Sequence, residues 1–389
     1  MEQRGFILIA DITGYTRYLN RSELDHAQST LTDLLELLVD RTRPPLVVSR
    51  LEGDAVLSYA LDSGLVTPQT FIEAIEDTYV AFRRAIEMMV LNNTCRCNAC
   101  ANVSSLDLKF FIHHGSFMFQ TVGGYQELVG SDVNLIHRLL KNTVTDRTGF
   151  GAYVLCTDAA EAALGLGDVA RTTMVRHQEM VDDFGEVTVW IKDMHPVFEA
   201  RKDDELISYS RDEVIDTFEI EIGLPPELVW DYLHQTEFRD TLMGSDRHEV
   251  RDRVEGRVGQ GSVYQCYHGK QVLPQVVLEW RPFERTVVKQ IVPVLGGPVE
   301  FLMDFGLTDA NGATRLTQTL ARLSGRLIRR LVVRAMVRTM HRQGLRDSEE
   351  FRRRIEADAA SRYAAAITAG PVPQGRIRAA AAESLRNGG

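Results

Sequence analysis

The sequence lacks a long hydrophobic run, a surplus of basic residues and a dense set of cysteines. A membrane-spanning helix needs about 20 consecutive apolar residues, and no segment approaches that length. The first residues, MEQRG, contain no apolar signal core. We therefore expect a cytoplasmic protein with no transmembrane segment.

The charge balance excludes a general nucleic-acid binder. Lys and Arg number 44 against 54 Asp and Glu, a formal net charge of −10, whereas binding to phosphate backbones needs a basic surplus. Any basic surface must therefore be local.

Five cysteines in 389 residues are too few for a disulfide scaffold.

The length and the 44% hydrophobic content predict two domains. The pattern becomes polar after His195-Pro196, and a new alternating segment, DTFEIEIGL, follows. We place one domain at 1–205 and a second at 214–356, and we expect the Ala, Gly and Arg-rich end, 357–389, to be disordered.

The first domain shows a βαββαβ order. Strands are predicted at Phe6 to Ala10, LVVSRLE, AVLSYA and LDLKFFIHHG, and long helical patterns follow the first and third of these. This order predicts an α+β fold of the ferredoxin-like class, an antiparallel sheet with helices on one face.

Two aspartates are candidate metal ligands. Asp11 ends the first strand, and Asp54 lies in a tight turn after Gly53, so neighbouring strands could bring both carboxylates to one edge. Paired oxygen ligands suit Mg²⁺ or Mn²⁺. An aspartate at a strand end is also a common cap or turn residue, and the pairing is what favours the metal.

Asn134 and Arg138 are four residues apart in a helical pattern and share one face. An amide and a guanidinium there could hold a ribose and a phosphate. The alternative is a helix cap and a surface salt bridge.

Four segments occur in the order found in class III nucleotide cyclases: ADITGYT, LEGDAVLSYA, FIHHG and LVGSDVNLIHRLL. The chain resembles that family from Gly5 to about Asp193. The resemblance implies that a nucleoside triphosphate is converted to a 3′,5′-cyclic monophosphate and pyrophosphate. It also implies a homodimer, because each site of these enzymes lies between two catalytic domains.

The resemblance assigns roles to individual residues. Asp11 and Asp54, with the Ile12 carbonyl, would hold two Mg²⁺ or Mn²⁺ ions per active site, Asn134 would orient the ribose, and Arg138 would stabilise charge at the α-phosphate. Catalysis of this kind is mostly positioning and charge neutralisation.

Base recognition departs from the family pattern. Arg50 and Glu127 stand at the two base-contact positions. A donor beside an acceptor suits adenine, which favours ATP, although the pair could also serve guanine. Alternatively, the two residues pair with each other and close the pocket. The lysine expected before the last strand is missing, and Asp182 and Asp183 stand there instead.

Cys95, Cys97 and Cys100 form an insertion relative to the usual cyclase. Three thiolates need a fourth ligand for a structural Zn²⁺ site, and His113, His114 and Cys156 are the nearest candidates. Reduced loop thiols or redox sensing are the alternatives.

The second domain shows a strand, a helix opened by Pro225-Pro226, several strands and a long last helix. The segments IGLPPELVWDYL, GRVGQGSVY, LEWRPFERTV and GATRLTQTL resemble the START-like (SRPBCC) superfamily. That resemblance implies a helix-grip fold with a cavity for a lipid or another hydrophobic ligand. Candidate lining residues are Phe238, Tyr264, Trp280 and Phe301, which are otherwise core residues.

Arginines recur at every fourth position from Arg322 to Arg346 in the last helix. Salt bridges to this acidic protein would explain them, as would contact with anionic lipid headgroups or a partner.

Two functions stay open. The first is a metal-dependent nucleotide cyclase, with adenylate cyclase favoured over guanylate cyclase, that the START-like domain regulates. The second is a catalytically inactive cyclase-homology sensor of nucleotides or ligands.

Overall fold

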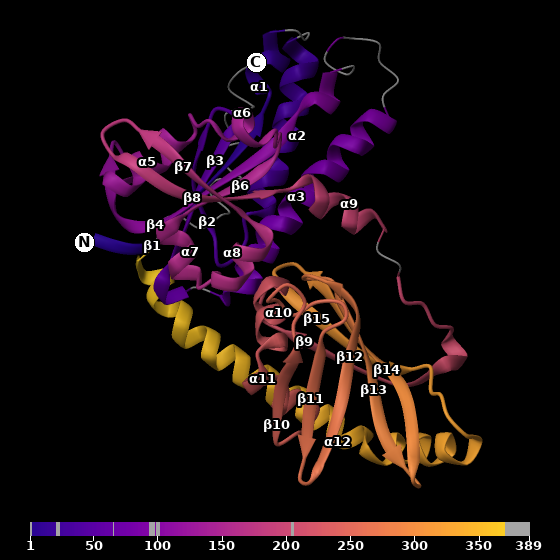
Figure 1. The fold of residues 1–389 in the computed structure, drawn as a ribbon. Coiled ribbons are helices and arrows are strands. Elements are labelled where there is room, and N and C mark those ends of the chain that lie inside the picture. Colours follow the sequence, from indigo (N-terminus) through magenta and orange to yellow (C-terminus); the bar gives the residue numbers. More distant parts are fainter. Residues whose placement is uncertain are drawn as a thin grey trace.

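The computed structural model describes residues 2–20, 24–64, 66–92, 98, 102–203 and 206–369. These residues form two β-sheets that follow one another along the chain (Figure 1). We call 2–203 the N-terminal unit and 206–369 the C-terminal unit.

The sheet of the N-terminal unit has the strand order β2-β3-β1-β4-β6-β8-β7, and β5 pairs with β4. Its strands are β1 (Glu2–Thr13), β2 (Val47–Glu52), β3 (Ala55–Leu61), β4 (Asp107–Val122), β5 (Tyr125–Val129), β6 (Tyr153–Thr157), β7 (Val175–Val181) and β8 (Gly185–Asp193). All pairs are antiparallel except β4 with β6. The central β1 pairs with β3 on one side and with β4 on the other, so neither of its edges is exposed.

The helices of this unit are α1 (Tyr15–Asn20), α2 (Leu24–Arg41), α3 (Pro68–Leu91), α5 (Ser131–Leu139), α6 (Val144–Thr148), α7 (Asp158–Leu164), α8 (Gly167–Thr173) and α9 (His195–Asp203). Short 3₁₀ turns occur at Asp62–Gly64 and Val103–Ser105, and another, Arg211–Glu213, precedes the first strand of the C-terminal unit.

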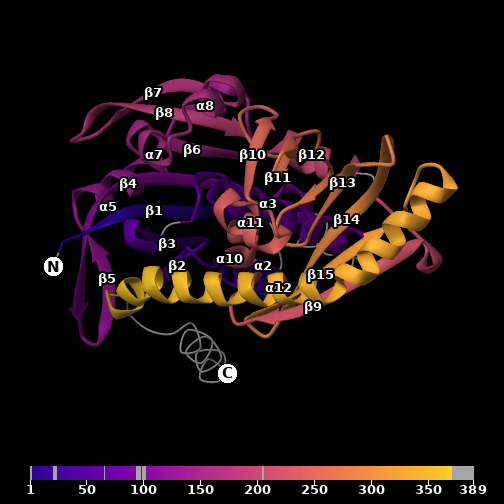
Figure 2. The ribbon, with the colours of Figure 1, turned by 90° about the horizontal axis from the view of Figure 1, so that it is seen from below.

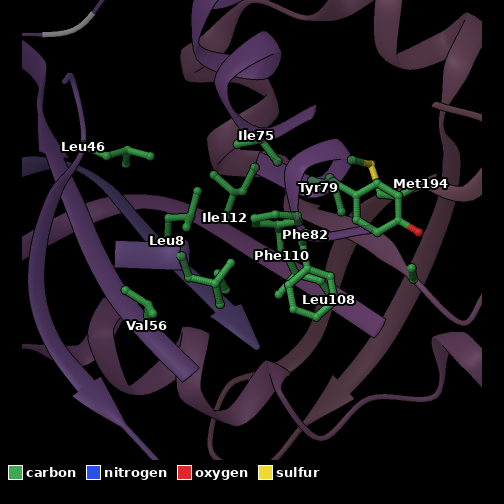
Figure 3. Close-up of a cluster of buried hydrophobic side chains, with 14 of the residues drawn as sticks. Leu8, Leu46, Val56, Ile75, Tyr79, Phe82, Leu108, Phe110, Ile112 and Met194 are labelled. Carbon is green, nitrogen blue, oxygen red and sulfur yellow. The ribbon is translucent and has the colours of Figure 1, made fainter. Parts of the chain in front are cut away.

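The expectation that helices cover one face of this sheet is wrong. Phe6 and Leu8 of β1 pack toward α2 and α3, in a core that also contains Ile75 and Tyr79 (Figure 3). Ile7 and Ile9 point to the opposite face, where α5 covers them. Successive residues of a strand alternate between faces, so the unbroken apolar run in β1 already requires a cover on both.

The sheet of the C-terminal unit is antiparallel throughout, in the order β10-β11-β12-β13-β14-β15-β9. Its elements are β9 (Val214–Ile222), α10 (Pro226–His234), α11 (Thr236–Met243), β10 (Arg247–Asp252), β11 (Val263–His268), β12 (Gln271–Arg281), β13 (Arg285–Val294), β14 (Gly297–Ala310), β15 (Ala313–Ala321) and α12 (Leu327–Ala369). Helix α12 packs Val333, Phe351 and Ile355 into the core of this unit.

The expected disorder from residue 357 onward is wrong over 357–369, because α12 continues to Ala369. Ala359 is buried in the core, and Asp358 accepts a hydrogen bond from Tyr232 at 2.7 Å and pairs with Arg362. These contacts extend the helix through an alanine-rich segment, a composition that itself favours helix. Residues 370–389 lie outside the described residues.

The two units meet along α3, which lies beside the C-terminal unit in both views (Figures 1 and 2). The buried Glu73 carboxylate accepts hydrogen bonds from the indole N–H of Trp230 (2.9 Å) and of Trp280 (2.8 Å). One turn further, Glu76 pairs with Arg257 of the C-terminal unit and with Lys192 of β8. Buried carboxylates are therefore the main polar link between the units.

Candidate functional site

Asp11 and Asp54 meet at one end of the N-terminal sheet. Strand β1 runs antiparallel to β3 with Asp11 opposite Ala55, and the Ile12 amide donates to the Asp54 carbonyl at 3.1 Å. Partial burial and the charge of Asp54 raise the pKa of Asp11 to about 6. Burial also raises the pKa of Asp54. The two carboxylates thus form an acidic pair whose charge is incompletely compensated.

This donor set fits a divalent cation. The Asp11 carboxylate forms no hydrogen bond or ion pair with any described residue, and a cation between the two carboxylates would relieve their repulsion. No cluster of three or more His, Cys, Asp or Glu side chains suited to a metal occurs in the described part of the chain. A cation here would therefore need further oxygens from the Ile12 carbonyl, from water or from a bound ligand.

Lys109 was not anticipated from the sequence. It lies opposite Asp11 across the β1–β4 pair, and its ammonium group is 4.8 Å from the centre of the Tyr153 ring. Its charge opposes the rise in the pKa of Asp11, while burial lowers its own pKa. The sequence does contain a signal for Lys109. It is the single lysine in the otherwise apolar segment of the predicted strand LDLKFF, and a lysine in a buried strand needs an acidic partner.

Helix α5 carries Asn134 and Arg138 and is fixed at its start to β4. The Asp132 carboxylate accepts a hydrogen bond from the Ser116 amide at 2.6 Å. Gly115 allows this approach, because a Cβ there would lie 2.2 Å from Asp132 Oδ2. The resulting orientation places Asn134 and Arg138 in one cavity.

That cavity has a volume of about 530 Å³ and is lined by Asn134, His137, Arg138, Lys141, Asp183 and Phe184. The Asp183 carboxylate lies 3.8 Å from the Arg138 guanidinium, and both side chains are exposed. Asp183 occupies the β7–β8 turn, where the sequence already lacked the expected lysine. An aspartate at this position partly neutralises the arginine instead of adding positive charge.

The structure brings the predicted residues together in two groups. Asp11 and Asp54 form one, and Asn134 and Arg138 form the other; neither aspartate lines the cavity that holds the second group.

Arg50 and Glu127 are joined by an ion pair of 3.0 Å. Arg50 also donates to Glu52, and Glu52 accepts from His137 at 2.8 Å. The hydrogen bond with His137 is the main cause that lowers the pKa of Glu52, and the same bond raises the pKa of His137. The alternative in which Arg50 and Glu127 pair with each other is the one observed.

Glu52 and His137 were missed from the sequence, although a signal existed for each. Glu52 is two residues from Arg50 on β2, and His137 lies on the same face of α5 as Asn134. Together they connect the strand that carries Arg50 to the helix that carries Arg138.

The predicted zinc ligands Cys95, Cys97 and Cys100 lie outside the described residues. Their candidate fourth ligands have other surroundings: His113 lies 2.9 Å from Thr157 Oγ1, His114 lies 3.0 Å from Asp62, and Cys156 is buried in the core. Burial raises the pKa of the Cys156 thiol.

The four residues predicted to line a ligand cavity have different positions. Phe238, Tyr264 and Phe301 are buried in the core of the C-terminal unit. Trp280 instead lines a cavity of about 490 Å³ between the two units. Other contributors from α3 and the C-terminal unit include Ile72, Glu73, Trp230, His234 and Val250.

No helix in the described residues is both long and apolar enough to cross a membrane.

Comparison with known proteins gives partial matches. The model of the family "Protein of unknown function (DUF2652)" matches residues 31–148, less than half of the chain. The uncharacterized protein Rv2561/Rv2562 of Mycobacterium tuberculosis (strain ATCC 25618 / H37Rv) is 31% identical over 134 residues, which are 34% of this chain and 60% of that protein. The chain thus spans less than two thirds of that relative.

Similar solved structures include nucleotide cyclases. A bacterial light-regulated adenylyl cyclase is 13% identical, with 50% of this chain and 53% of that chain covered and a TM-score of 0.39. The adenylyl cyclase CyaB from P. aeruginosa is 13% identical, with 55% and 97% covered and a TM-score of 0.36. The guanylyl cyclase Cya2 is 14% identical, with 49% and 92% covered and a TM-score of 0.36.

Proposed function

We propose that the protein is a metal-dependent nucleotide cyclase that converts a nucleoside triphosphate, with ATP favoured, to a 3′,5′-cyclic monophosphate and pyrophosphate. The observation that carries this proposal is the adjacency of Asp11 and Asp54 at one end of the sheet, where the pKa of Asp11 is raised to about 6. The class III cyclase motifs stated above support it, since they assign metal binding to the same two residues.

In the proposed reaction the ribose 3′ oxygen bonds to the α-phosphorus, the bond from that phosphorus to the β-phosphate oxygen breaks, and the hydroxyl proton is released. Asp11, Asp54 and the Ile12 carbonyl would hold two Mg²⁺ or Mn²⁺ ions, which supply charge neutralisation for the triphosphate and the attacking oxygen. The Asn134 amide would orient the ribose, and the Arg138 guanidinium would neutralise charge at the α-phosphate.

The proposed enzyme acts as a homodimer. The cavity with Asn134 and Arg138 excludes Asp11 and Asp54, so one copy would supply the aspartates and its partner the asparagine and arginine. Arg50 and Glu127 would contact the base once their mutual ion pair opens.

The decisive experiment incubates the protein with Mn²⁺ and each of ATP, GTP, CTP and UTP, and detects cyclic products by mass spectrometry. Asp54→Ala should abolish the product. Asp168→Ala, which removes an exposed aspartate of α8, should leave it unchanged. The absence of product from every nucleotide, with a folded dimer, would contradict the proposal.

A second candidate is a catalytically inactive sensor that keeps this fold. The Arg50–Glu127 ion pair and the aspartate beside Arg138 favour it, because they oppose entry of a base and of phosphates. Binding of a nucleotide in calorimetry without turnover would identify this function.

We further propose that the C-terminal unit is a START-like domain that regulates the site through a hydrophobic ligand in the cavity between the units. Trp230 and Trp280 of the C-terminal unit and Ile72 of α3 line this cavity and would give a ligand apolar contact. Helix α3 links the cavity to the N-terminal sheet. The fluorescent probe 1-anilinonaphthalene-8-sulfonate should bind there, and Val250→Trp, which fills the cavity, should remove that binding. Unchanged probe fluorescence in the variant would contradict this location.

A further inference from the structure

The first half of α12 and the residue before it carry an isolated block of positive charge. From Arg326 to Arg346 there are seven arginines and no acidic residue, in a chain of net charge −10. None of the seven forms a salt bridge with a described residue. In the second half of the same helix, Arg352, Arg353 and Arg362 all pair with carboxylates.

This contrast corrects one expectation from the sequence. Salt bridges to the acidic protein were one explanation of the arginine repeat, and within the described part of the chain only Arg322, ahead of the helix, has such a partner, Glu213 at 3.7 Å. Of the remaining arginines, Arg326, Arg338, Arg342 and Arg346 are exposed.

Apolar side chains occupy the solvent face at the start of this helix. Leu327 and Ile328 are each 69% exposed, and Leu331 is 58% exposed. At about 100° per residue the three lie within roughly one quarter to one third of the circumference, away from the buried Val333. Further along, the exposed Arg338, Arg342 and Arg346 continue on the same side of the helix.

The turn between β13 and β14 contacts the start of the helix through Arg329, which projects from a different side of the helix than Leu327 and Leu331. Leu295 is 67% exposed at its tip. The Arg329 guanidinium donates to the Leu295 carbonyl at 3.3 Å and packs directly on Gly297, where a Cβ would lie 1.9 Å from it. The hairpin tip thereby holds the start of the helix in place.

We propose that this amphipathic face of α12, formed by Leu327, Ile328, Leu331, Arg338, Arg342 and Arg346, docks on an anionic lipid bilayer. Its leucines and isoleucine would enter the headgroup region, and its arginines would contact phosphate and carboxylate groups. Figure 2 shows α12 along one side of the molecule.

Charge complementarity favours a bilayer over a second copy of the chain. A symmetric dimer brings the same patch of both copies together. Because no acidic residue occurs between Arg326 and Arg346, a symmetric pairing of this segment offers no carboxylate to the seven arginines of the other copy.

The test is co-sedimentation of the full chain with phosphatidylcholine vesicles that contain or lack phosphatidylserine, at low salt. We expect binding only to the phosphatidylserine vesicles, weakened by added salt. Replacing Arg338, Arg342 and Arg346 by Gln should weaken it by about 100-fold, since each arginine near such a surface contributes about fivefold.

A charge-matched control replaces three exposed arginines elsewhere, Arg4, Arg171 and Arg247, by Gln and should bind like the wild type. Replacing Leu327, Ile328 and Leu331 by Ser should weaken vesicle binding by about tenfold or more. All these side chains are exposed or partly exposed, so the fold should persist, which circular dichroism checks.

Equal binding to both vesicle types, or no binding to either, would overturn the proposal. A wild-type dimer in sedimentation equilibrium that the serine variant dissociates, without vesicle binding, would assign the surface to a second copy and overturn it as well.

Discussion

Replacing Glu73 by Gln should remove a specific pH dependence from the stability of the protein. Glu73 is buried between the two units, and burial raises its pKa from 4.5 to about 7, although Gln69, Trp280 and Trp230 donate hydrogen bonds to it. The folded state therefore binds this proton more tightly than the unfolded state. The stabilisation that this bound proton gives the folded state is fully present below pH 4.5 and is lost as the pH rises to about 7.

The size of this effect follows from the two pKa values. A change from 4.5 to about 7 corresponds to about 3 kcal/mol of unfolding free energy. Relative to the Glu73→Gln variant, which cannot ionise, the wild type should thus lose about 3 kcal/mol between about pH 4.5 and pH 8. Urea unfolding followed by tryptophan fluorescence measures this difference, and Trp230 and Trp280 report directly on the contact.

Glu76 provides a matched control on the same helix with the opposite sign. Its buried carboxylate is paired with Lys192 and Arg257, which lower its pKa to about 2 in spite of burial. Its contribution is present above pH 4.5 and is lost only as the pH falls through about 2. Glu76→Gln should cost about 3 kcal/mol with little change between about pH 5 and pH 8. A pH-independent effect of Glu73→Gln, or one that grows in the other direction, would refute this reasoning.

Three further predictions concern single positions. In the proposed cyclase reaction, Arg138→Ala should lower turnover by about 100-fold or more because it would remove the proposed charge stabilisation at the α-phosphate, and steady-state kinetics that show only a raised KM would contradict that role. His137→Phe should destabilise the protein by about 1 kcal/mol at about pH 6 and by less above the raised pKa of His137, since the pair with Glu52 requires the protonated ring. Urea unfolding of both proteins at about pH 6 and above the pKa of His137 measures this difference. Gly5→Ala should cost about 3 kcal/mol, because its Cβ would lie 2.1 Å from the Ala60 carbonyl oxygen, and an unchanged Tm would refute the close approach.

Part of the candidate site was predictable because it depends on local signals. Asp11 follows an apolar run, and Asp54 follows a glycine with a φ of +67°, so the ends of two strands could be located from the sequence. Antiparallel pairing of β1 with β3 then brings the two residues together.

Contacts between distant segments could not be predicted in this way. The bond between Glu52 and His137 joins residues 85 positions apart, and nothing in either segment specifies the other. The same holds for α3. Periodicity predicts a helix there, but it cannot distinguish a polar face in water from one covered by a second unit, so it gives no signal that Glu73 and Glu76 are buried.

Arginine spacing in α12 shows a further limit of the same kind. The repeat at every fourth position was evident, but its meaning depended on which carboxylates lie nearby in the folded chain. Only the structure shows that the arginines from Arg326 to Arg346 have no salt bridge with a described residue, whereas Arg352 and Arg353 in the second half do.

The polar junction along α3 has an evolutionary consequence. Glu73 is stable in a buried position only with the indoles of Trp230 and Trp280, and Glu76 depends on Arg257. Loss of the C-terminal unit in a descendant would free both glutamates to drift as solvent-exposed positions, whereas a chain that keeps both units should change these residues in concert. Positions 73 and 76 can therefore serve as markers of whether the two units have been inherited together.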